Sequence, residues 1–166
     1  SLIGGGGDNL VLKAARALQK AAGTDAGEAC PGAEIILTKN LPVASGIGGG
    51  SADAAATLRA LTCLWGVGLE KSALAELALT LGADVPFCLE GKAAFVGGIG
   101  EEITPAPPLP KAWVVLVNPM APLSTPAVFK ARAGDFSSAG RFDTIPGHGG
   151  ELAALLKGRH NDLAVA

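Results

Sequence analysis

The sequence predicts an α/β fold of two layers, in the broad sense that includes α+β arrangements. Two observations support this prediction. Stretches with helical apolar spacing alternate along the chain with short apolar, β-branched runs that turn residues flank. The composition is 49% hydrophobic and 17% charged over 166 residues. These values are typical of a chain that folds around a single core, and not of a disordered or highly charged chain.

The first predicted elements are a helix and a strand. Asp8 and Asn9 are good helix-capping residues, and the apolar spacing after them predicts a helix over about residues 9–22 that ends at Gly23. Residues 33–37 are apolar and β-branched, and turn residues flank them on both sides. This run therefore predicts a strand.

Helices and several short strands are predicted further along the chain. From Ser51 to Trp65 the sequence is alanine-rich and glycine-free, and Gly66 follows it, which predicts a helix directly after a glycine-rich loop. A third helix is predicted over about residues 71–81. The remaining predicted elements are strand-like pieces near 87–89 and 93–96, a proline-rich connector at 104–110, a strand at 113–117, a polar loop at 131–150 and a helix at about 151–157.

Charge and composition exclude several classes of protein. The net charge is −2 and no block of more than two Lys or Arg residues occurs, so the sequence has no basic footprint for nucleic acid or for an anionic membrane surface. The sequence contains no uninterrupted run of about 18 apolar residues, so it predicts no membrane-spanning helix. The three cysteines are widely spaced without a CxxC pair, so we expect no disulfide framework, no zinc site and a reducing, cytoplasmic compartment.

The segment that carries most information about chemistry is a glycine-rich loop between the strand predicted at 33–37 and the helix predicted from Ser51. Glycines allow backbone N–H groups to turn inward, and a helix N-terminus adds about half a positive charge. This arrangement predicts a binding site for a polyphosphate. The residues of this segment are Pro42, Val43, Ala44, Ser45, Gly46, Ile47, Gly48, Gly49, Gly50, Ser51 and Ala52.

Three common motifs do not match this loop. The P-loop motif GxxxxGK[ST] requires a lysine directly before its Ser or Thr, and no lysine lies between Lys39 and Lys71. The dinucleotide-binding motif GxGxxG fails because Ser51 occupies the position of the third glycine. The GxSxG nucleophile motif is also absent, so these three classes of site are excluded.

The loop instead resembles the phosphate-binding motif of the GHMP kinases, in which a proline and three further residues are followed by Gly-Leu-Gly-Ser-Ser-Ala. Pro42, Gly46, Ile47, Gly48 and Ser51 occur here in the same order. Further short motifs that are similar to those of the family follow in family order at residues 8–11, 81–87, 97–101, 118–119, 124–129 and 161–163. The resemblance therefore extends over nearly the whole chain.

This resemblance implies a small-molecule kinase that uses ATP and Mg²⁺. Residues 42–52 would hold the ATP phosphates, and Ser51 would lie near the magnesium ion. Asp84 would be the catalytic aspartate beside the substrate hydroxyl, and Thr125 would lie in the wall of the phosphoryl-transfer site. An aspartate suits this role because its carboxylate can accept or orient the proton of the attacking hydroxyl.

The resemblance also implies a domain organisation. Residues 1–111 would form the two-layer N-terminal domain of the family, of the ribosomal-protein-S5-like type, and residues 112–166 would begin its ferredoxin-like C-terminal domain. The family's N-terminal lysine segment and its final Gly-Ser-Gly loop have no counterpart in this sequence, and Ala52 replaces a common serine. We therefore expect an internal fragment that is inactive alone, because it lacks the lysine that partners the catalytic aspartate.

The longer glycine motif, residues 48–55, is similar to a narrower branch of the family. Members of that branch transfer the ATP γ-phosphoryl group to the 2-hydroxyl of 4-diphosphocytidyl-2-C-methyl-D-erythritol, in the non-mevalonate route to isoprenoids. This small molecule is the partner that the resemblance implies. Two alternatives stay open: another GHMP kinase, of the homoserine or mevalonate type, and a catalytically silent piece with only a nucleotide-binding or structural role.

Overall fold

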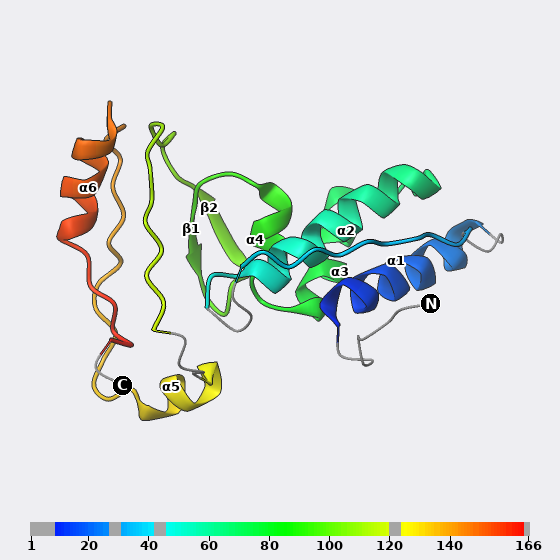
Figure 1. Ribbon diagram of the computed structural model, residues 1–166, viewed down its shortest axis with the longest axis horizontal. Helices are drawn as coiled ribbons and strands as arrows, with labels where there is room; N and C mark the ends of the chain where they lie inside the picture. Colours follow the sequence, from blue (N-terminus) through cyan, green and yellow to red (C-terminus); the bar gives the residue numbers. More distant parts are fainter. Residues whose placement is uncertain (1–8, 27–30, 42–45, 120–123, 165–166) are drawn as a thin grey trace. The chain divides into compact units, whose positions relative to one another are not determined.

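The computed structural model describes residues 9–26, 31–41, 46–119 and 124–164. They form two compact units, of which the first contains the described residues up to 41, residues 48–92 and residues 96–103, and the second contains the rest. Figure 1 shows the elements in chain order: α1 (Leu10–Ala26), α2 (Gly49–Trp65), α3 (Lys71–Leu81), α4 (Val85–Glu90), β1 (Ala94–Gly97), β2 (Glu102–Pro105), α5 (Thr125–Ala131) and α6 (Gly149–Lys157).

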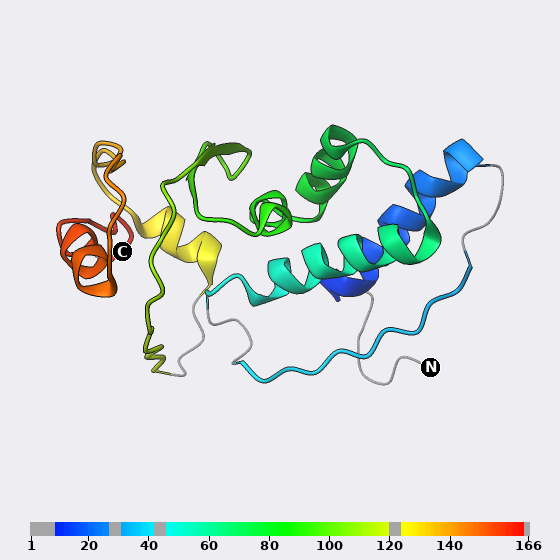
Figure 2. The ribbon, with the colours of Figure 1, turned by 90° about the horizontal axis from the view of Figure 1, so that it is seen from above.

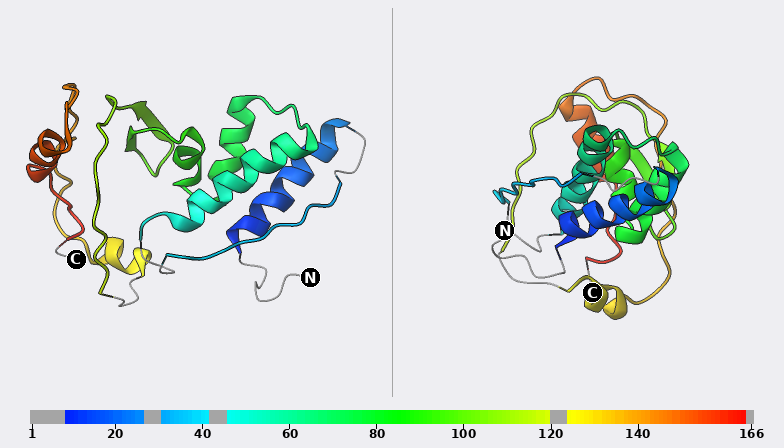
Figure 3. Two further views of the ribbon diagram at one scale, coloured as in Figure 1. Left: turned by 45° about the horizontal axis from the view of Figure 1, so that its top comes forward. Right: turned by 90° about the vertical axis from the view of Figure 1, so that its right-hand side faces the viewer.

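The core of the first unit lies between its four helices. α1 and α2 lie side by side, and α3 and α4 pack against this pair (Figures 2 and 3). Several of the buried side chains are alanines, whose small size allows helices to approach closely. The core cluster consists of Ala14, Leu18, Ala54, Ala55, Leu58, Leu61, Ala78 and Val85.

Local signals at the helix ends explain where α1 and α2 begin and end. The Asn9 side chain accepts a hydrogen bond from the Val11 N–H at 3.0 Å and so caps α1 as predicted, while Asp8 lies outside the described residues. α1 continues past Gly23, because a glycine inside a helix costs only about 1 kcal/mol. α2 ends where predicted, at Gly66, which has a φ of 62° and donates a hydrogen bond to the Cys63 carbonyl.

The strand-like piece predicted near residues 87–89 is wrong, because these residues belong to helix α4. A three-residue apolar run is too short to distinguish a strand from a helical turn. In the structure Val85 is buried in the core, and Cys88 and Leu89 pack against the same cluster. This spacing of three and four residues is helical. The piece predicted at 93–96 corresponds to β1, which pairs with β2 in a two-stranded sheet, and α3 has its predicted bounds.

The strands predicted at 33–37 and 113–117 are also wrong: within the described residues, neither segment belongs to a sheet. Both have the composition of strands, but a strand forms only when a neighbouring strand pairs with its N–H and C=O groups. Most of their side chains are exposed, with Ile36 at 84% and Trp113 at 93% of full accessibility, whereas Ile35 packs against the core cluster. The sequence pattern thus identified two segments with the composition of strands, but among the described residues neither has a partner strand.

The second unit contains α5 and α6. α5 begins with Pro126 in its first turn, a position where proline fits a helix without loss of a hydrogen bond, and the sequence pattern did not indicate it. α6 begins at Gly149, slightly before the predicted start, because the His148 Nδ1 accepts hydrogen bonds from the N–H groups of Gly150 and Glu151 at 3.1 and 3.3 Å. In the part of the chain that the structure describes, no helix is both long and apolar enough to span a bilayer.

Leu58→Ala is expected to lower the free energy of unfolding by about 2–5 kcal/mol, because Leu58 is fully buried and its truncation leaves a cavity between the helices. Leu64→Ala provides a matched control on the same helix. Leu64 is 64% exposed, so its truncation should change the free energy of unfolding by about 0.5 kcal/mol or less. Urea unfolding followed by circular dichroism measures both changes, and equal losses would contradict this core.

Candidate active site

The described part of the glycine-rich loop leads into the N-terminus of α2. Gly48 directly precedes the helix with a φ of 71°, and Gly46 has a φ of 72°; this left-handed region is readily accessible only to glycine. The Ala52 N–H donates a hydrogen bond to the Gly48 carbonyl at 2.9 Å, which closes the first helical turn. By helix geometry, the N–H groups of residues 49–51 therefore point out of the helix end.

This helix end fits a phosphate group. A Cβ added at Gly46, Gly48, Gly49 or Gly50 would meet no atom within 4 Å, so space is open around the loop backbone. Several outward N–H groups and the positive end of a helix dipole together favour an oxyanion. α2 begins at Gly49 rather than at Ser51, so the last two glycines of the loop lie inside the helix and contribute its first N–H groups.

Ser51 is half-buried in the first turn of α2, whereas Ala52 is exposed and adds no hydroxyl. Protein sites for Mg²⁺ that is bound with a nucleotide use one or two side chains together with phosphate oxygens and water. A single hydroxyl at Ser51 next to the outward N–H groups fits this pattern. The loop residues Pro42, Val43, Ala44 and Ser45 lie outside the described residues.

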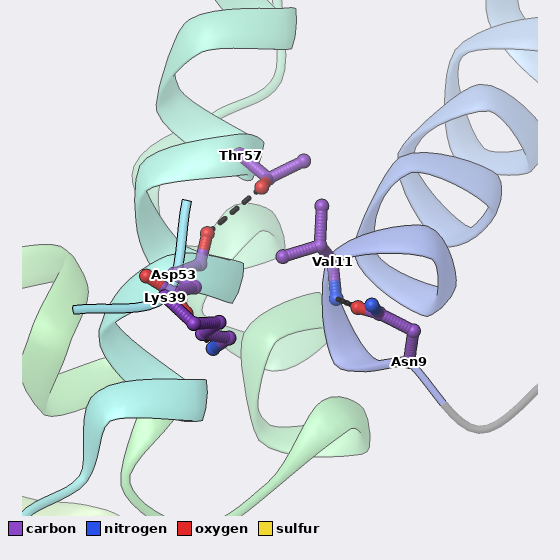
Figure 4. A network of polar contacts seen from close by, with 5 residues as sticks. All are labelled: Asn9, Val11, Lys39, Asp53 and Thr57. Atoms are coloured by element: carbon purple, nitrogen blue, oxygen red, sulfur yellow. Dashed lines mark hydrogen bonds and ion pairs between the residues drawn. The ribbon is translucent and has the colours of Figure 1, made fainter. Parts of the chain in front are cut away.

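Lys39, which the sequence analysis did not assign to the site, lies against the beginning of α2. Its ammonium forms an ion pair with the Asp53 carboxylate (Figure 4), and both side chains are partly exposed. The buried Thr57 hydroxyl donates a hydrogen bond to the Asp53 carbonyl at 2.8 Å. The pair connects the extended segment 31–40 to α2, and a cavity of about 360 Å³ lies between them. No spacing rule links a lysine before the loop to an aspartate after it.

Asp84 lies in the turn between α3 and α4, at the N-cap position of α4. The Val85 N–H donates a hydrogen bond to the Gly82 carbonyl at 3.1 Å, and the Cys88 N–H donates one to the Asp84 carbonyl at 3.1 Å. The Asp84 carboxylate makes no capping hydrogen bond to its own helix and is exposed. An aspartate in such a turn usually caps the helix with its side chain. Because the Asp84 carboxylate does not do so and is exposed, it is accessible to a substrate.

A shared core links Asp84 to the glycine-rich loop. Val85, the residue after Asp84, is completely buried in the same cluster as Ala54 and Ala55, which lie one turn beyond the loop. Helices α2 and α4 are in direct contact. The structure therefore positions the predicted catalytic aspartate and the start of α2 on one packed framework within the first unit.

The pKa of the Cys88 thiol reports on the surroundings of Asp84. Burial raises this pKa above its ordinary value, and the negative charge of Asp84 raises it further, while the positive charge of Arg59 opposes the rise. Arg59 extends from α2, and its guanidinium would lie 3.4 Å from a Cβ added at Gly91, the C-cap of α4. The charges of Asp84 and Arg59 thus act on the pKa of this thiol in opposite directions.

Two other acidic residues near the site have structural contacts of their own. Glu101 accepts a hydrogen bond from the Ile99 N–H at 2.7 Å within the turn between β1 and β2. The Glu102 side chain lies against Gly97 in the same hairpin. Among the described residues, no three His, Cys, Asp or Glu side chains gather as a metal-binding group.

Thr125 is the first residue of α5 and is exposed. It belongs to the second unit, whereas the start of α2 and Asp84 belong to the first. Its placement in the wall of the phosphoryl-transfer site stays a prediction.

The chain belongs to the GHMP kinase family: residues 9–92 match the family described as GHMP kinases N terminal domain. It is similar to a solved structure described as the crystal structure of 4-(cytidine 5'-diphospho)-2C-methyl-D-erythritol kinase. That alignment has a TM-score of 0.64 at 34% identity and covers 98% of this chain and 56% of the other. These matches confirm the predicted α/β fold class and family.

Individual relatives identify the branch of the family. The chain is 54% identical over 157 residues to the 4-diphosphocytidyl-2-C-methyl-D-erythritol kinase of Rhodospirillum rubrum, covering 95% of this chain and 50% of that protein. It is 57% identical over 133 residues to the same kinase of Rhizobium johnstonii, covering 80% and 43%. The chain spans about half the length of the curated relatives that it matches. The resemblance carried by residues 48–55 is thereby confirmed.

Asp84→Asn is expected to shift the pH dependence of Cys88 alkylation by iodoacetamide to lower pH. The thiolate is the reactive form, and removal of the negative charge lowers the thiol pKa, so more thiolate is present at each pH. Arg59→Gln should shift the profile to higher pH. Mass spectrometry of the peptide that contains Cys88 measures the rates.

Glu90→Gln, at the far end of α4, is the matched control for this experiment and should leave the alkylation profile in place. An unchanged profile in Asp84→Asn would contradict the proximity of the carboxylate and the thiol.

Proposed function

We propose that this chain carries the nucleotide-binding part of a kinase that phosphorylates the 2-hydroxyl of 4-diphosphocytidyl-2-C-methyl-D-erythritol at the expense of ATP. The main support is the identity of 54% to a kinase named for this substrate, over 95% of the chain. The glycine-rich loop at the start of α2 and the exposed Asp84 supply the groups that such a reaction needs. The reaction belongs to the non-mevalonate route to isoprenoids, and the cytoplasm stays the predicted location.

In this proposal the N–H groups of residues 49–51 bind the ATP phosphates, and the N-terminal dipole of α2 stabilises their negative charge. Ser51 is the side chain suited to contact Mg²⁺. Bound with ATP, Mg²⁺ neutralises the charge that develops on the transferred phosphoryl group. The chain itself contributes orientation, because its outward N–H groups are fixed by a helix whose core side chains are fully buried.

The proposed role of Asp84 is to accept or orient the proton of the 2-hydroxyl as its oxygen forms a bond to the γ-phosphorus. The bond between that phosphorus and the bridging oxygen breaks, and ADP leaves with the electron pair. An exposed carboxylate with no capping bond is free to make this contact. A positioned general base contributes about 10²–10⁴-fold to such a rate.

Asp84→Asn is expected to lower kcat by about 10²–10⁴-fold while the Kd for ATP stays unchanged, because the amide cannot accept the proton and the loop is untouched. The assay uses the polypeptide that carries this chain together with the rest of the relatives' length, with 4-diphosphocytidyl-2-C-methyl-D-erythritol and ATP. Glu90→Gln, an exposed change on the same helix, should retain full activity.

An unchanged kcat in Asp84→Asn would exclude the proposed role of Asp84. A substrate panel with homoserine and mevalonate tests the proposed acceptor. Preference for either compound would move the protein to another branch of the family.

Lys39→Met is expected to raise the Kd for ATP about tenfold, because it removes the ammonium that lies beside the first turns of α2 and a charge-assisted contact to phosphate is worth about 1.5–3 kcal/mol. Asp53→Asn breaks the same ion pair but leaves the ammonium, so it should bind ATP at least as tightly as the original protein. Isothermal titration calorimetry measures both. Equal weakening in the two variants would show that the pair only holds segment 31–40 in place.

A further inference from the structure

The turn between β1 and β2 packs closely against the peptide that joins Ala83 to Asp84. Gly100 in this turn is buried and has a φ of 127°. A Cβ added at Gly100 would lie 2.4 Å from the Ala83 carbonyl oxygen, 2.8 Å from its carbonyl carbon and 3.0 Å from its Cβ. Real side chains essentially never approach backbone so closely. Gly100 is therefore required by close approach as well as by its backbone conformation.

The turn that presents Gly100 is itself braced. The Gly100 N–H donates a hydrogen bond to the Gly97 carbonyl at 3.0 Å, which closes the turn. The Ile99 N–H donates one to the Glu101 carboxylate at 2.7 Å. These two hydrogen bonds fix the shape of the turn that brings Gly100 against Ala83.

The segment that carries Asp84 is also held by the core. Val85 is completely buried, and its N–H is bonded to the Gly82 carbonyl at 3.1 Å. The backbone of Asp84 is thus restrained by the buried residue after it and by the contact of the Gly100 turn with the residue before it. Displacement of the Ala83 carbonyl would shift the Asp84 backbone directly, because both belong to one planar peptide.

We propose that Gly100 is a positioning residue for phosphoryl transfer: by lacking a side chain, it lets the hairpin turn hold the Ala83–Asp84 peptide, and hence the Asp84 carboxylate, in its catalytic place. This inference rests on the proposed function of Asp84. It concerns the chemical step and leaves ATP binding to the start of α2.

The size of the effect follows from the clash. An ordinary contact requires the Ala83 carbonyl and a Cβ at Gly100 to separate by roughly 1 Å more than the structure allows, and a displacement of about 1 Å in a reacting group costs about 10²-fold in rate. Gly100→Ala should therefore lower kcat about 100-fold and leave the Kd for ATP within about twofold.

Gly66→Ala, at the end of α2, is the control for alanine at a positive φ. Gly66 has a left-handed φ of 62°, and a Cβ added there would meet no atom within 4 Å. Both variants carry backbone strain, and the strain is larger at the φ of 127° of Gly100. Only Gly100→Ala presses on the Ala83 backbone, so kcat of Gly66→Ala should stay close to that of the original protein.

A double-mutant cycle with Asp84→Asn tests whether Gly100 acts through Asp84. In the long polypeptide used for the activity assay, Gly100→Ala should have almost no further effect on kcat once Asp84 is replaced. An equal loss in both backgrounds, a parallel loss of ATP binding, or an unchanged kcat in Gly100→Ala would each overturn the inference. Full activity of Asp84→Asn alone would instead refute the proposed role of Asp84, so the two failures are distinguishable.

Ala83→Gly keeps the test decisive if Gly100→Ala does not fold, because it adds no atoms. It loosens the same peptide and removes the Ala83 Cβ, which lies 3.0 Å from the Cβ position of Gly100. We expect kcat to fall about threefold, with thermal unfolding and the Kd for ATP nearly unchanged. A kcat equal to that of the original protein would contradict the positioning role.

Discussion

The contact of Val85 with the alanines of α2 is the interaction on which the candidate site depends. Val85 is completely buried and shares one cluster with Ala54 and Ala55, at the beginning of α2. Because alanine side chains are short, α4 can pack closely against this part of α2. Asp84 directly precedes Val85, so the burial of one valine fixes the carboxylate on the framework that also holds the outward N–H groups of the loop. A larger side chain at either alanine would separate the two.

Two glycines complete this framework for different physical reasons. Gly48 has a φ of 71° with open space around it, so glycine is needed there for its conformation, which turns the chain into α2. Gly100 has a backbone carbonyl within 2.4 Å of its missing Cβ, so glycine is needed there for close approach. Gly48 controls where the N–H groups at the start of α2 point, and Gly100 controls how near the hairpin comes to the Ala83–Asp84 peptide.

Sequence reasoning predicted α2, α3 and the beginning of α1 because their apolar spacing and caps are local signals. It failed for residues 33–37 and 113–117, because strand formation depends on a partner that a local pattern does not contain. The loop and Asp84 were identified from motifs, because each lies in a short stretch of consecutive residues that resembles a family motif. Lys39 was not identified, and Gly100 was found only as part of the motif at 97–101, without a role. The importance of both comes from contacts with Asp53 and Ala83, which lie 14 and 17 positions away in the sequence.

In the proposed function, these contacts separate nucleotide binding from the chemical step. Phosphate binding would depend on N–H groups whose directions are set by the first turn of α2, and the Ala52–Gly48 hydrogen bond closes that turn. The position of Asp84 depends on Val85, the buried residue after it, and on the Gly100 turn, which lies against Ala83, the residue before it. A change in the hairpin can therefore displace the carboxylate without moving the loop, since no hairpin atom is needed to close the first turn of α2. In the proposed function, ATP binding and the positioning of the catalytic carboxylate therefore depend on different backbone contacts.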